Sequence, residues 1–262
     1  MFSILVDITK CSGCEKCIEA CIKKNKLNLE KADYDRATSK DGLSADRLLS
    51  IKKIEEGHFA RYSCMHCVEP ACVSACLVGG ITKSAEGPVI YDSEKCIGCR
   101  YCMLACPFHI PRYEWSETKP FMKKCNMCYE RIKENEIPSC VQACSYNAII
   151  FGERNVLLKH AHSIINSNKI KYINHVWGEK EFGGTSLLYI SDVDLGDMGW
   201  PSKLAKPIPD VTEPLIEKTP VIGLAVGGCL VGLNWIIKRR MEFAGQNDSA
   251  PKNEREEDGN EK

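Results

Sequence analysis

The sequence predicts an α+β fold followed by a single C-terminal transmembrane helix, and three observations lead to this class. Short apolar segments of strand type alternate with loops and helical segments as far as residue 193. Sixteen of the seventeen cysteines fall into four runs of four, all within residues 1–155. A mostly apolar stretch at 221–237 is followed directly by three basic residues.

Length and composition narrow the class of protein. The chain of 262 residues is long enough for one or two domains, and its 35 basic and 35 acidic residues balance. The charge therefore gives no argument for a nucleic acid or an acidic partner. Seventeen cysteines is far above ordinary usage. Disulfide pairing does not predict their arrangement in C-x2-C pairs, whereas ligation of metal clusters does.

The third cysteine run has the spacing C-x2-C-x2-C-x3-C-P, which holds a cubane iron-sulfur cluster. It consists of Cys96, Cys99, Cys102 and Cys106, followed by Pro107. In two-cluster ferredoxins the fourth cysteine of such a run ligates the other cluster. A partner run is therefore expected elsewhere, and the chain offers three.

The other runs repeat in two patterns. The first has the same spacing without the proline: Cys11, Cys14, Cys17 and Cys21. The second and fourth share a different frame, and they are Cys64, Cys67, Cys72 and Cys76, then Cys125, Cys128, Cys140 and Cys144. With the pattern of the first and third runs called A and that of the second and fourth called B, the order along the chain is A, B, A, B. This order indicates duplicated modules that complete each other's sites. Because none of the sixteen positions is substituted, four [4Fe-4S] clusters are predicted, with these cysteines as iron ligands.

Basic residues lie among the cysteines. An oxidised cubane with four thiolates carries a charge of about −2, which the formal sum omits. Side chains that can offset it locally, or that form a solvated face, are Lys10, Lys16, Lys95, Arg100, Lys123, Lys124 and Arg131. Gly13 and Gly98 are expected where a tight loop brings N–H groups close to sulfur and leaves no space for a Cβ.

The segments between the runs predict the domain plan. Residues 1–155 form the cluster domain, with strands at 2–8 and 148–151, a hairpin at 81–91, and an inner module at about 60–119. The insertion at 22–63 is a subunit contact, a cover over a cluster, or a plain surface excursion. Within it, residues 48–54 fit either a helix or a strand.

The cysteine-free remainder divides into three parts. Residues 156–219 form a covering segment with a helix at 156–165, a strand at 186–193 and an extended proline-rich linker over 201–220. Residues 220–240 form the transmembrane helix, in which Cys229 packs as a small apolar residue. A buried soluble helix or an amphipathic anchor is the alternative, favoured by Asn234. The polar tail at 241–262 is expected to be disordered, and no signal peptide is expected before Cys11.

The main rival to iron is zinc, because C-x2-C pairs also form tetrahedral sulfur sites. Only the fourth run resembles a zinc ribbon, since three cysteines at successive spacings of three do not suit zinc. His66 and His109 are expected to be packing or second-layer groups, because each nearby run already has four thiolates. No catalytic residue is identified, so the chain is interpreted as an electron conduit. A soluble polyferredoxin carrier and a zinc-stabilised scaffold are the alternatives.

With these motifs assembled, the chain resembles the four-cluster iron-sulfur (beta) subunits of membrane-bound respiratory complexes. Members serve formate dehydrogenases, nickel-iron hydrogenases and DMSO-reductase-type molybdoenzymes. The resemblance covers all four runs in order, and residues 177–181, 183–185 and 188–193 look like the segment after the clusters in the first two branches. The sequence departs from the family pattern where proline is missing after Cys21, Cys76 and Cys144.

The resemblance implies two bacterial-ferredoxin-like modules of two clusters each, formed by crossed ligation. The implied ligand sets are Cys11, Cys14, Cys17 and Cys144; Cys125, Cys128, Cys140 and Cys21; Cys64, Cys67, Cys72 and Cys106; and Cys96, Cys99, Cys102 and Cys76. Electrons would pass through them in that order from a catalytic subunit with molybdenum- or tungsten-pterin or nickel-iron. The last cluster would lie beside a membrane cytochrome b or polysulfide-reductase-like quinone subunit.

The resemblance and the flanking charges also predict the location. The chain is expected in the cell membrane as a single-pass protein, exported with a signal-bearing partner. Lys238, Arg239 and Arg240 next to the helix place the tail in the cytoplasm, so that the cluster domain faces outward.

Overall fold

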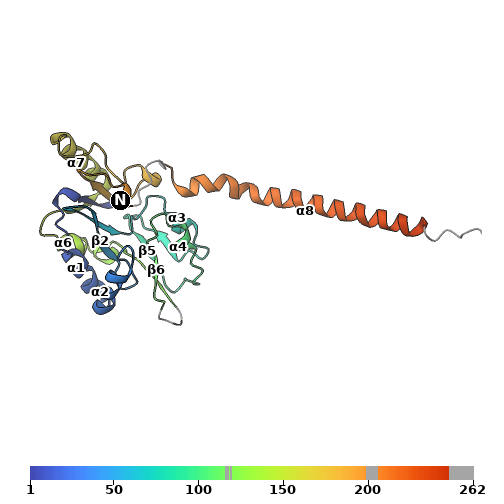
Figure 1. Ribbon diagram of the computed structural model, residues 1–262, viewed down its shortest axis with the longest axis horizontal. Helices are drawn as coiled ribbons and strands as arrows, with labels where there is room; N and C mark the ends of the chain where they lie inside the picture. The colour runs from blue at the N-terminus through green and yellow to red at the C-terminus, as the bar shows by residue number, and fades with distance from the viewer. Residues whose placement is uncertain (116–117, 119, 199–205, 248–262) are drawn as a thin grey trace, which may run out of the picture. The chain divides into compact units, whose positions relative to one another are not determined.

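The computed structural model describes residues 1–115, 118, 120–198 and 206–247. It divides into two compact units, Met1–Val211 and Thr212–Lys262, which are treated separately below. Figure 1 traces the order of the elements along the chain. Residues 248–262 of the tail predicted to be disordered at 241–262, and the linker residues 201–205, lie outside the described residues.

A three-stranded sheet joins segments that are far apart in the sequence. Strand β1 (Phe2–Asp7) lies at its centre, antiparallel to β8 (Ile149–Glu153) and parallel to β9 (Leu187–Ile190). The strands predicted at 2–8, 148–151 and 186–193 are therefore confirmed. Because the first cysteine run follows β1 and the fourth precedes β8, their pairing brings these two runs together.

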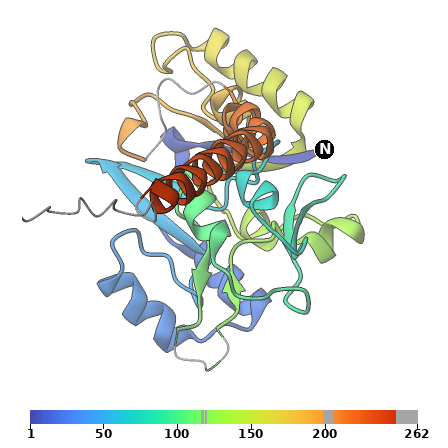
Figure 2. The ribbon, with the colours of Figure 1, turned by 90° about the vertical axis from the view of Figure 1, so that its right-hand side faces the viewer.

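The helix expected at 156–165 is α7 (Arg154–Ser167), which covers one face of this sheet. Figures 1 and 2 both show it beside β1. Its buried residues Leu157, Ala161 and Ile165 pack against Leu5 and Leu188 of the strands. Arg154 donates to the carbonyl oxygens of residues 185, 178 and 179 at 2.9, 3.1 and 2.9 Å, and so fixes the segment between α7 and β9.

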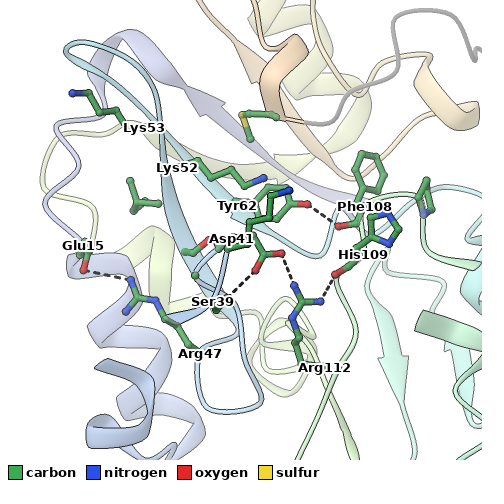
Figure 3. Close-up of a pocket in the computed structure, with 16 residues that line it drawn as sticks. Glu15, Ser39, Asp41, Arg47, Lys52, Lys53, Tyr62, Phe108, His109 and Arg112 are labelled. Atoms are coloured by element: carbon green, nitrogen blue, oxygen red, sulfur yellow. Dashed lines mark hydrogen bonds and ion pairs between the residues drawn. The ribbon is translucent and has the colours of Figure 1, made fainter. Parts of the chain in front are cut away.

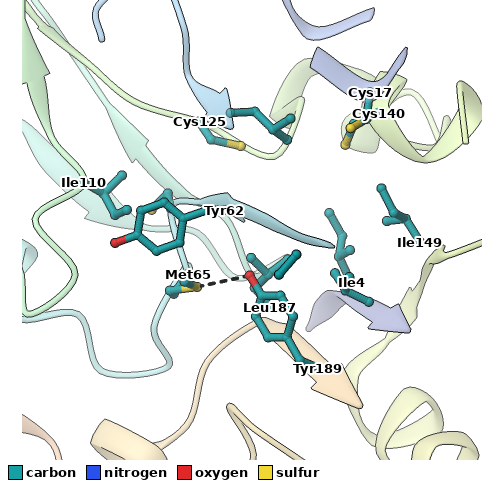
Figure 4. Close-up of a cluster of buried hydrophobic side chains, with 14 of the residues drawn as sticks. Ile4, Cys17, Tyr62, Met65, Ile110, Cys125, Cys140, Ile149, Leu187 and Tyr189 are labelled. Carbon is teal, nitrogen blue, oxygen red and sulfur yellow. Dashed lines mark hydrogen bonds between the residues drawn. The ribbon is translucent and has the colours of Figure 1, made fainter. Parts of the chain in front are cut away.

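The opposite face of the sheet packs on the cysteines. Side chains alternate along a strand, so Ile4 and Val6 of β1 join a second core together with Cys17, Cys125 and Cys140. Figure 4 shows Ile4, Ile149 and Leu187 in this core, with the sulfur atoms of Cys17 and Cys140 close to each other. The apolar core and the cysteine sites are therefore one continuous packing unit.

Three hairpins build the rest of the first unit. Strands β2 (Leu49–Glu55) and β3 (His58–Ser63) pair antiparallel, so the ambiguous residues 48–54 form a strand. Strands β4 (Ile81–Lys83) and β5 (Val89–Tyr91) form the hairpin expected at 81–91. Strands β6 (Arg112–Tyr113) and β7 (Met122–Lys123) form the third.

The helices of the first unit are mostly short. The first cysteine run leads into α1 (Lys16–Asn25), which is followed by α2 (Leu29–Thr38). The remaining ones are α3 (Ala71–Ser74), α4 (Tyr101–Ala105), α5 (Tyr129–Lys133), α6 (Ser139–Gln142) and the 3-10 turns η1 (Ile8–Lys10), η2 (Glu181–Gly183) and η3 (Gly196–Met198). Because α1 continues past Cys21, a proline at position 22 would break it, which explains the Ile22 found there.

Within the insertion, β3 is not a surface excursion. Ala60, Arg61, Tyr62 and Ser63 are all buried. The ring of Phe59 lies within 2.9 Å of where a Cβ on Gly13 would stand, so the hairpin covers the first cysteine loop. Of the three interpretations of residues 22–63, cover over a cluster site is the one that this packing supports.

The C-terminal helix is longer than expected. Helix α8 runs over Ile208–Asn247, whereas the sequence predicts an extended linker up to 220 and a polar tail from 241. Pro209 lies in the first turn, where its missing N–H costs no hydrogen bond. Residues Glu217–Met241 are long and apolar enough to cross a membrane by length and composition, and they include the predicted span 220–240.

Candidate metal centres

The loops of the first and third runs have the same backbone conformation. Gly13 and Gly98 have φ of 72° and 71°, and Glu15 and Arg100, which precede α1 and α4, have φ of 60° and 64°. These angles lie in the left-handed region, where glycine is favoured. A Cβ on Gly13 would contact Phe59, but one on Gly98 would meet no atom within 4 Å. The positive φ therefore accounts for glycine at both positions, and Phe59 adds a lack of space at Gly13; that a bound cluster leaves no space for a Cβ stays a prediction.

The second and fourth runs share a different local structure. Each contains a one-turn helix preceded by proline, α3 after Pro70 and α6 after Pro138. The third cysteine of each run, Cys72 or Cys140, is the second residue of that helix. The A, B, A, B repeat of the sequence is thus a repeat of two loop conformations.

The structure brings the sixteen cysteines together across the runs. Four sets of neighbours result, here called groups 1 to 4: Cys11, Cys14, Cys17 and Cys144; Cys21, Cys125, Cys128 and Cys140; Cys64, Cys67, Cys72 and Cys106; and Cys76, Cys96, Cys99 and Cys102. Each group takes three cysteines from one run and one from another. These are proximities of side chains, and the assignment of iron ligands stays a prediction.

Group 1 lines a cavity between β1, α1 and the β2–β3 hairpin. Its four cysteines share the cavity with Ile51 of β2 and Arg61 of β3. Burial, with smaller contributions from Cys140 and Cys11, raises the pKa of Cys17 to about 12. Without a bound metal this thiol is therefore protonated at neutral pH, and metal binding must displace its proton.

Group 4 lines a second cavity near the surface, together with Tyr91 and Tyr113. The Cys102 sulfur lies 3.5 Å from the Tyr113 hydroxyl, and the Gly80 N–H donates to the Cys76 sulfur at 3.2 Å. Cys99 is exposed. Cys14 of group 1 is exposed as well, so groups 1 and 4 both reach the surface.

Groups 2 and 3 are more deeply buried. Burial raises the pKa of Cys21 well above its usual value, and the neighbouring thiols of Cys125, Cys140 and Cys128 raise it further. In group 3, burial raises the pKa of Cys67, with Cys64, Cys106 and Cys72 adding to the effect. Several thiols forced together in a dry environment stay ionised only when a cation compensates them.

Backbone N–H groups point at several of the sulfur atoms. Met127 donates to Cys125 at 3.3 Å, Gly98 to Cys96 at 3.4 Å, and Ile110 to Cys106 at 3.5 Å. Such hydrogen bonds favour the thiolate and are one of the factors that set cluster potentials. Within the described residues, no three His, Cys, Asp or Glu side chains are arranged to hold a single metal ion.

Two buried cations lie among the groups. Lys124, 8% exposed, donates to the carbonyl oxygen of Cys125 at 3.1 Å. Arg61, 1% exposed, donates to the Ser63 hydroxyl at 2.8 Å and lies 3.7 Å from the Cys140 sulfur. Lys124 is among the basic residues that the sequence indicates, but Arg61 is not, because the insertion carries no motif and burial of an arginine depends on tertiary packing.

Most other basic residues named from the sequence lie at the surface. Lys95 and Lys123 pair with Asp92 and Glu114, each at 3.3 Å, and Lys10 pairs with Asp7 at 3.0 Å. These lysines therefore form a solvated face, which is one of the two roles that the sequence predicts for the basic residues among the cysteines. Their charges act on the clusters through solvent.

The two histidines differ in role. His66 is buried, and its Nδ1 accepts a hydrogen bond from the Val89 N–H at 2.9 Å. Burial, together with Lys124 and Lys83, lowers its pKa well below the usual value, so it is neutral. His109 is exposed. His66 thus acts as a packing and hydrogen-bonding group, as expected.

A separate pocket of about 890 Å³ lies beside the hairpin β2–β3 (Figure 3). Arg112 pairs there with Asp41 and donates to the His109 carbonyl oxygen, and Arg47 pairs with Glu15 at 3.4 Å. The described residues that line it include no cysteine. Its arginine charges are used in internal ion pairs.

Comparison with known proteins matches residues 56–154 to a 4Fe-4S dicluster domain. The hydrogenase-2 operon protein HybA of Escherichia coli O157:H7 is 31% identical, over 76% of this chain and 72% of its own length. The iron-sulfur subunit of the nitrate-inducible formate dehydrogenase of Escherichia coli K12 is 32% identical, over 71% and 66%. The B component of anaerobic dimethyl sulfoxide reductase from the same strain is 37% identical, over 60% and 76%.

Proposed function

Because this chain belongs to the family of 4Fe-4S iron-sulfur subunits of respiratory oxidoreductases, we propose that it conducts electrons through four [4Fe-4S] clusters. The clusters would connect a catalytic subunit, of the formate dehydrogenase or hydrogenase type, with a quinone or cytochrome subunit in the membrane. The chain itself would be the non-catalytic part of the complex.

The proposed ligands are the cysteines of groups 1 to 4, arranged as two ferredoxin-like modules. The observation that supports this most strongly is the mixing of runs in every group, such as Cys144 with Cys11, Cys14 and Cys17 around one cavity. Crossed ligation of this kind is typical of two-cluster ferredoxins. Four thiols from two runs around one cavity fit a cubane, whereas three cysteines at successive spacings of three do not suit zinc.

The proposed order of the centres follows from the contacts between groups. The thiol of Cys17 in group 1 lies close enough to Cys140 in group 2 for their charges to interact. The thiol of Cys64 in group 3 interacts in the same way with Cys125 in group 2. Cys72 of group 3 has Cys102 of group 4. These links support a single line from group 1 to group 4, with no branch.

The protein's contribution is to hold and insulate the path. A bound [4Fe-4S] cluster supplies one-electron transfer. The thiolates would bind it, N–H groups such as those of Met127 and Ile110 donate to their sulfur atoms, and the side chains of Ile51 and Arg61 line the first cavity. No proton transfer or covalent chemistry is required of the chain.

The membrane side of the proposal rests on two surfaces. Residues Glu217–Met241 would form the single span, with the cluster domain facing outward and the basic flank at 238–240 in the cytoplasm. Around group 4, the large apolar side chains of Ile97, Tyr101 and Leu104 are exposed by 64%, 50% and 82%. Exposed apolar side chains gathered in this way are typical of a docking surface, here for the membrane subunit.

The experiment is anaerobic purification from membranes in mild detergent, with metal analysis of the chain and of any large subunit that accompanies it. We expect roughly sixteen irons per copy of this chain, beside molybdenum, tungsten or nickel in the partner. Recovery of the iron-loaded chain alone in the soluble fraction would favour a mobile polyferredoxin instead. A chain containing zinc and no iron would reject both.

A further inference from the structure

Arg61 lies between two of the proposed centres. It lines the cavity of group 1, and one guanidinium nitrogen is 3.7 Å from the Cys140 sulfur of group 2. It comes from β3 in the insertion, outside every cysteine run. One side chain therefore reaches both groups.

The charge of Arg61 is not balanced by a carboxylate. Its hydrogen bonds go to the Ser63 hydroxyl and the Cys140 sulfur, its Nε has no partner, and no described Asp or Glu pairs with it. An arginine cannot lose its proton in a protein, and an uncompensated buried cation is strongly unfavourable. An anion other than a carboxylate is therefore required beside it.

The surrounding thiols supply the compensation when ionised. Cys17 lines the same cavity as Arg61, and the Cys140 sulfur lies 3.7 Å from its guanidinium group, so one thiol of group 1 and one of group 2 are placed beside the charge. An oxidised cubane with four thiolates carries about −2, and reduction makes it more negative. A fixed positive charge nearby favours the reduced form.

We propose that Arg61 sets the reduction potentials of the centres at groups 1 and 2 together, as one positive charge shared between them. This inference rests on the proposed function, since it requires clusters at both groups. The charge raises both potentials, so the two centres nearest the catalytic subunit accept electrons more readily. The insertion would then be part of the redox machinery and not only a cover.

The test is a redox titration followed by electron paramagnetic resonance on the purified, iron-loaded complex. Arg61→Gln removes the charge and keeps a donor for Ser63, whereas Arg61→Lys keeps the charge. We expect Arg61→Gln to lower the reduction potentials of two of the four centres by about 59 mV or more each. This shift corresponds to a change of at least tenfold in the one-electron equilibrium constant. In Arg61→Lys the same equilibrium constants should stay within about threefold of their wild-type values, because the positive charge remains.

Arg154→Met serves as the matched control, because this half-buried arginine donates to three carbonyl oxygens and to no cysteine. It should leave all four potentials unchanged. Equal potentials in Arg61→Gln and Arg61→Lys, or failure of both to assemble centres at groups 1 and 2, would overturn the proposal and make Arg61 a purely structural residue. A wild-type complex without four cubane signals would instead reject the proposed function.

Discussion

The Tyr189 hydroxyl donates a 2.8 Å hydrogen bond to the backbone carbonyl oxygen of Arg61. The bond joins β9, which follows all the cysteine runs, to β3 in the insertion. Both residues are fully buried. The cysteine-free segment after the clusters therefore positions the strand that reaches into the first two groups.

Tyr189→Phe should destabilise the protein modestly without loss of iron. It removes one donor from a buried carbonyl, which costs about 1 kcal/mol and should lower Tm by about 2–4 °C. Thermal unfolding of the iron-loaded protein measures the change. Tyr101→Phe, at an exposed tyrosine, is the control and should leave Tm unchanged; an equal fall in both variants would contradict the role given to the Tyr189 hydroxyl.

Cys99→Ala should damage the centre at group 4 and leave the other three. Iron content should fall by about four per chain, and electron flow to quinone should stop while dye-linked activity of the catalytic partner persists. Cys229→Ser, in α8 and outside the four groups, is the control and should keep full iron. Unchanged quinone reduction in Cys99→Ala would count against the proposed path.

Gly13→Ala should be more damaging than Gly98→Ala. Both positions have φ near 70°, so alanine costs about 1–2 kcal/mol at either. Only at Gly13 does the new methyl group also meet Phe59, at 2.9 Å. Cluster loss on heating, followed by visible absorbance, should occur at the lowest temperature in Gly13→Ala. Identical behaviour of the two variants would mean that the hairpin does not press on the first loop.

The contact between His58 and Asp192 should make stability depend on pH. Their side chains lie 3.2 Å apart, and the hydrogen bond to Asp192 raises the pKa of His58. Stabilisation is therefore complete below the ordinary histidine value of about 6.5 and is lost as pH rises through the raised folded value. The Tm difference between wild type and Asp192→Asn should be present at pH 6 and vanish by pH 9. A Tm difference between wild type and Asp192→Asn that grows as pH rises would contradict this prediction.

Removal of the C-terminal unit should release the protein from membranes. A chain ending at Val211, the boundary of the first compact unit, lacks the candidate span Glu217–Met241. We expect it in the soluble fraction with its iron retained. Fractionation with iron analysis checks this, and continued membrane association after a carbonate wash would indicate that contacts with partner subunits suffice for attachment.

The elements that sequence reasoning located correctly depend on local signals. The strands at 2–7 and 149–153 and the hairpin at 81–91 have β-branched residues bounded by turn residues, and α7 has helical spacing. The repeated cysteine frame likewise reflects a repeated loop, including φ near 70° at Gly13 and Gly98.

What sequence reasoning missed depends on packing between distant segments. Nothing local distinguishes Arg61 from a surface arginine until β2 and β3 cover the first cysteine loop. Residues 48–54 are ambiguous in the sequence because a short apolar run fits either the helical or the strand period, and the structure forms β2 there. The start of α8 at Ile208 was missed because its prolines suggested an extended chain.

The central position of β1 has a consequence for biogenesis. On the ribosome, the cavity of group 1 cannot close until β8 and β9 have emerged, because β1 pairs with both and Cys144 precedes β8. The eight cysteines of groups 3 and 4 lie within residues 64–106, so they can come together before β8 and β9 emerge, although Tyr113 and Thr185 later pack against them. Contacts close in sequence form first, so the nascent chain should complete its two inner centres before the outer pair. Iron delivery to Cys11, Cys14 and Cys17 would then be the last step of maturation, and a pause in translation before residue 190 would leave those three thiols exposed to oxidation.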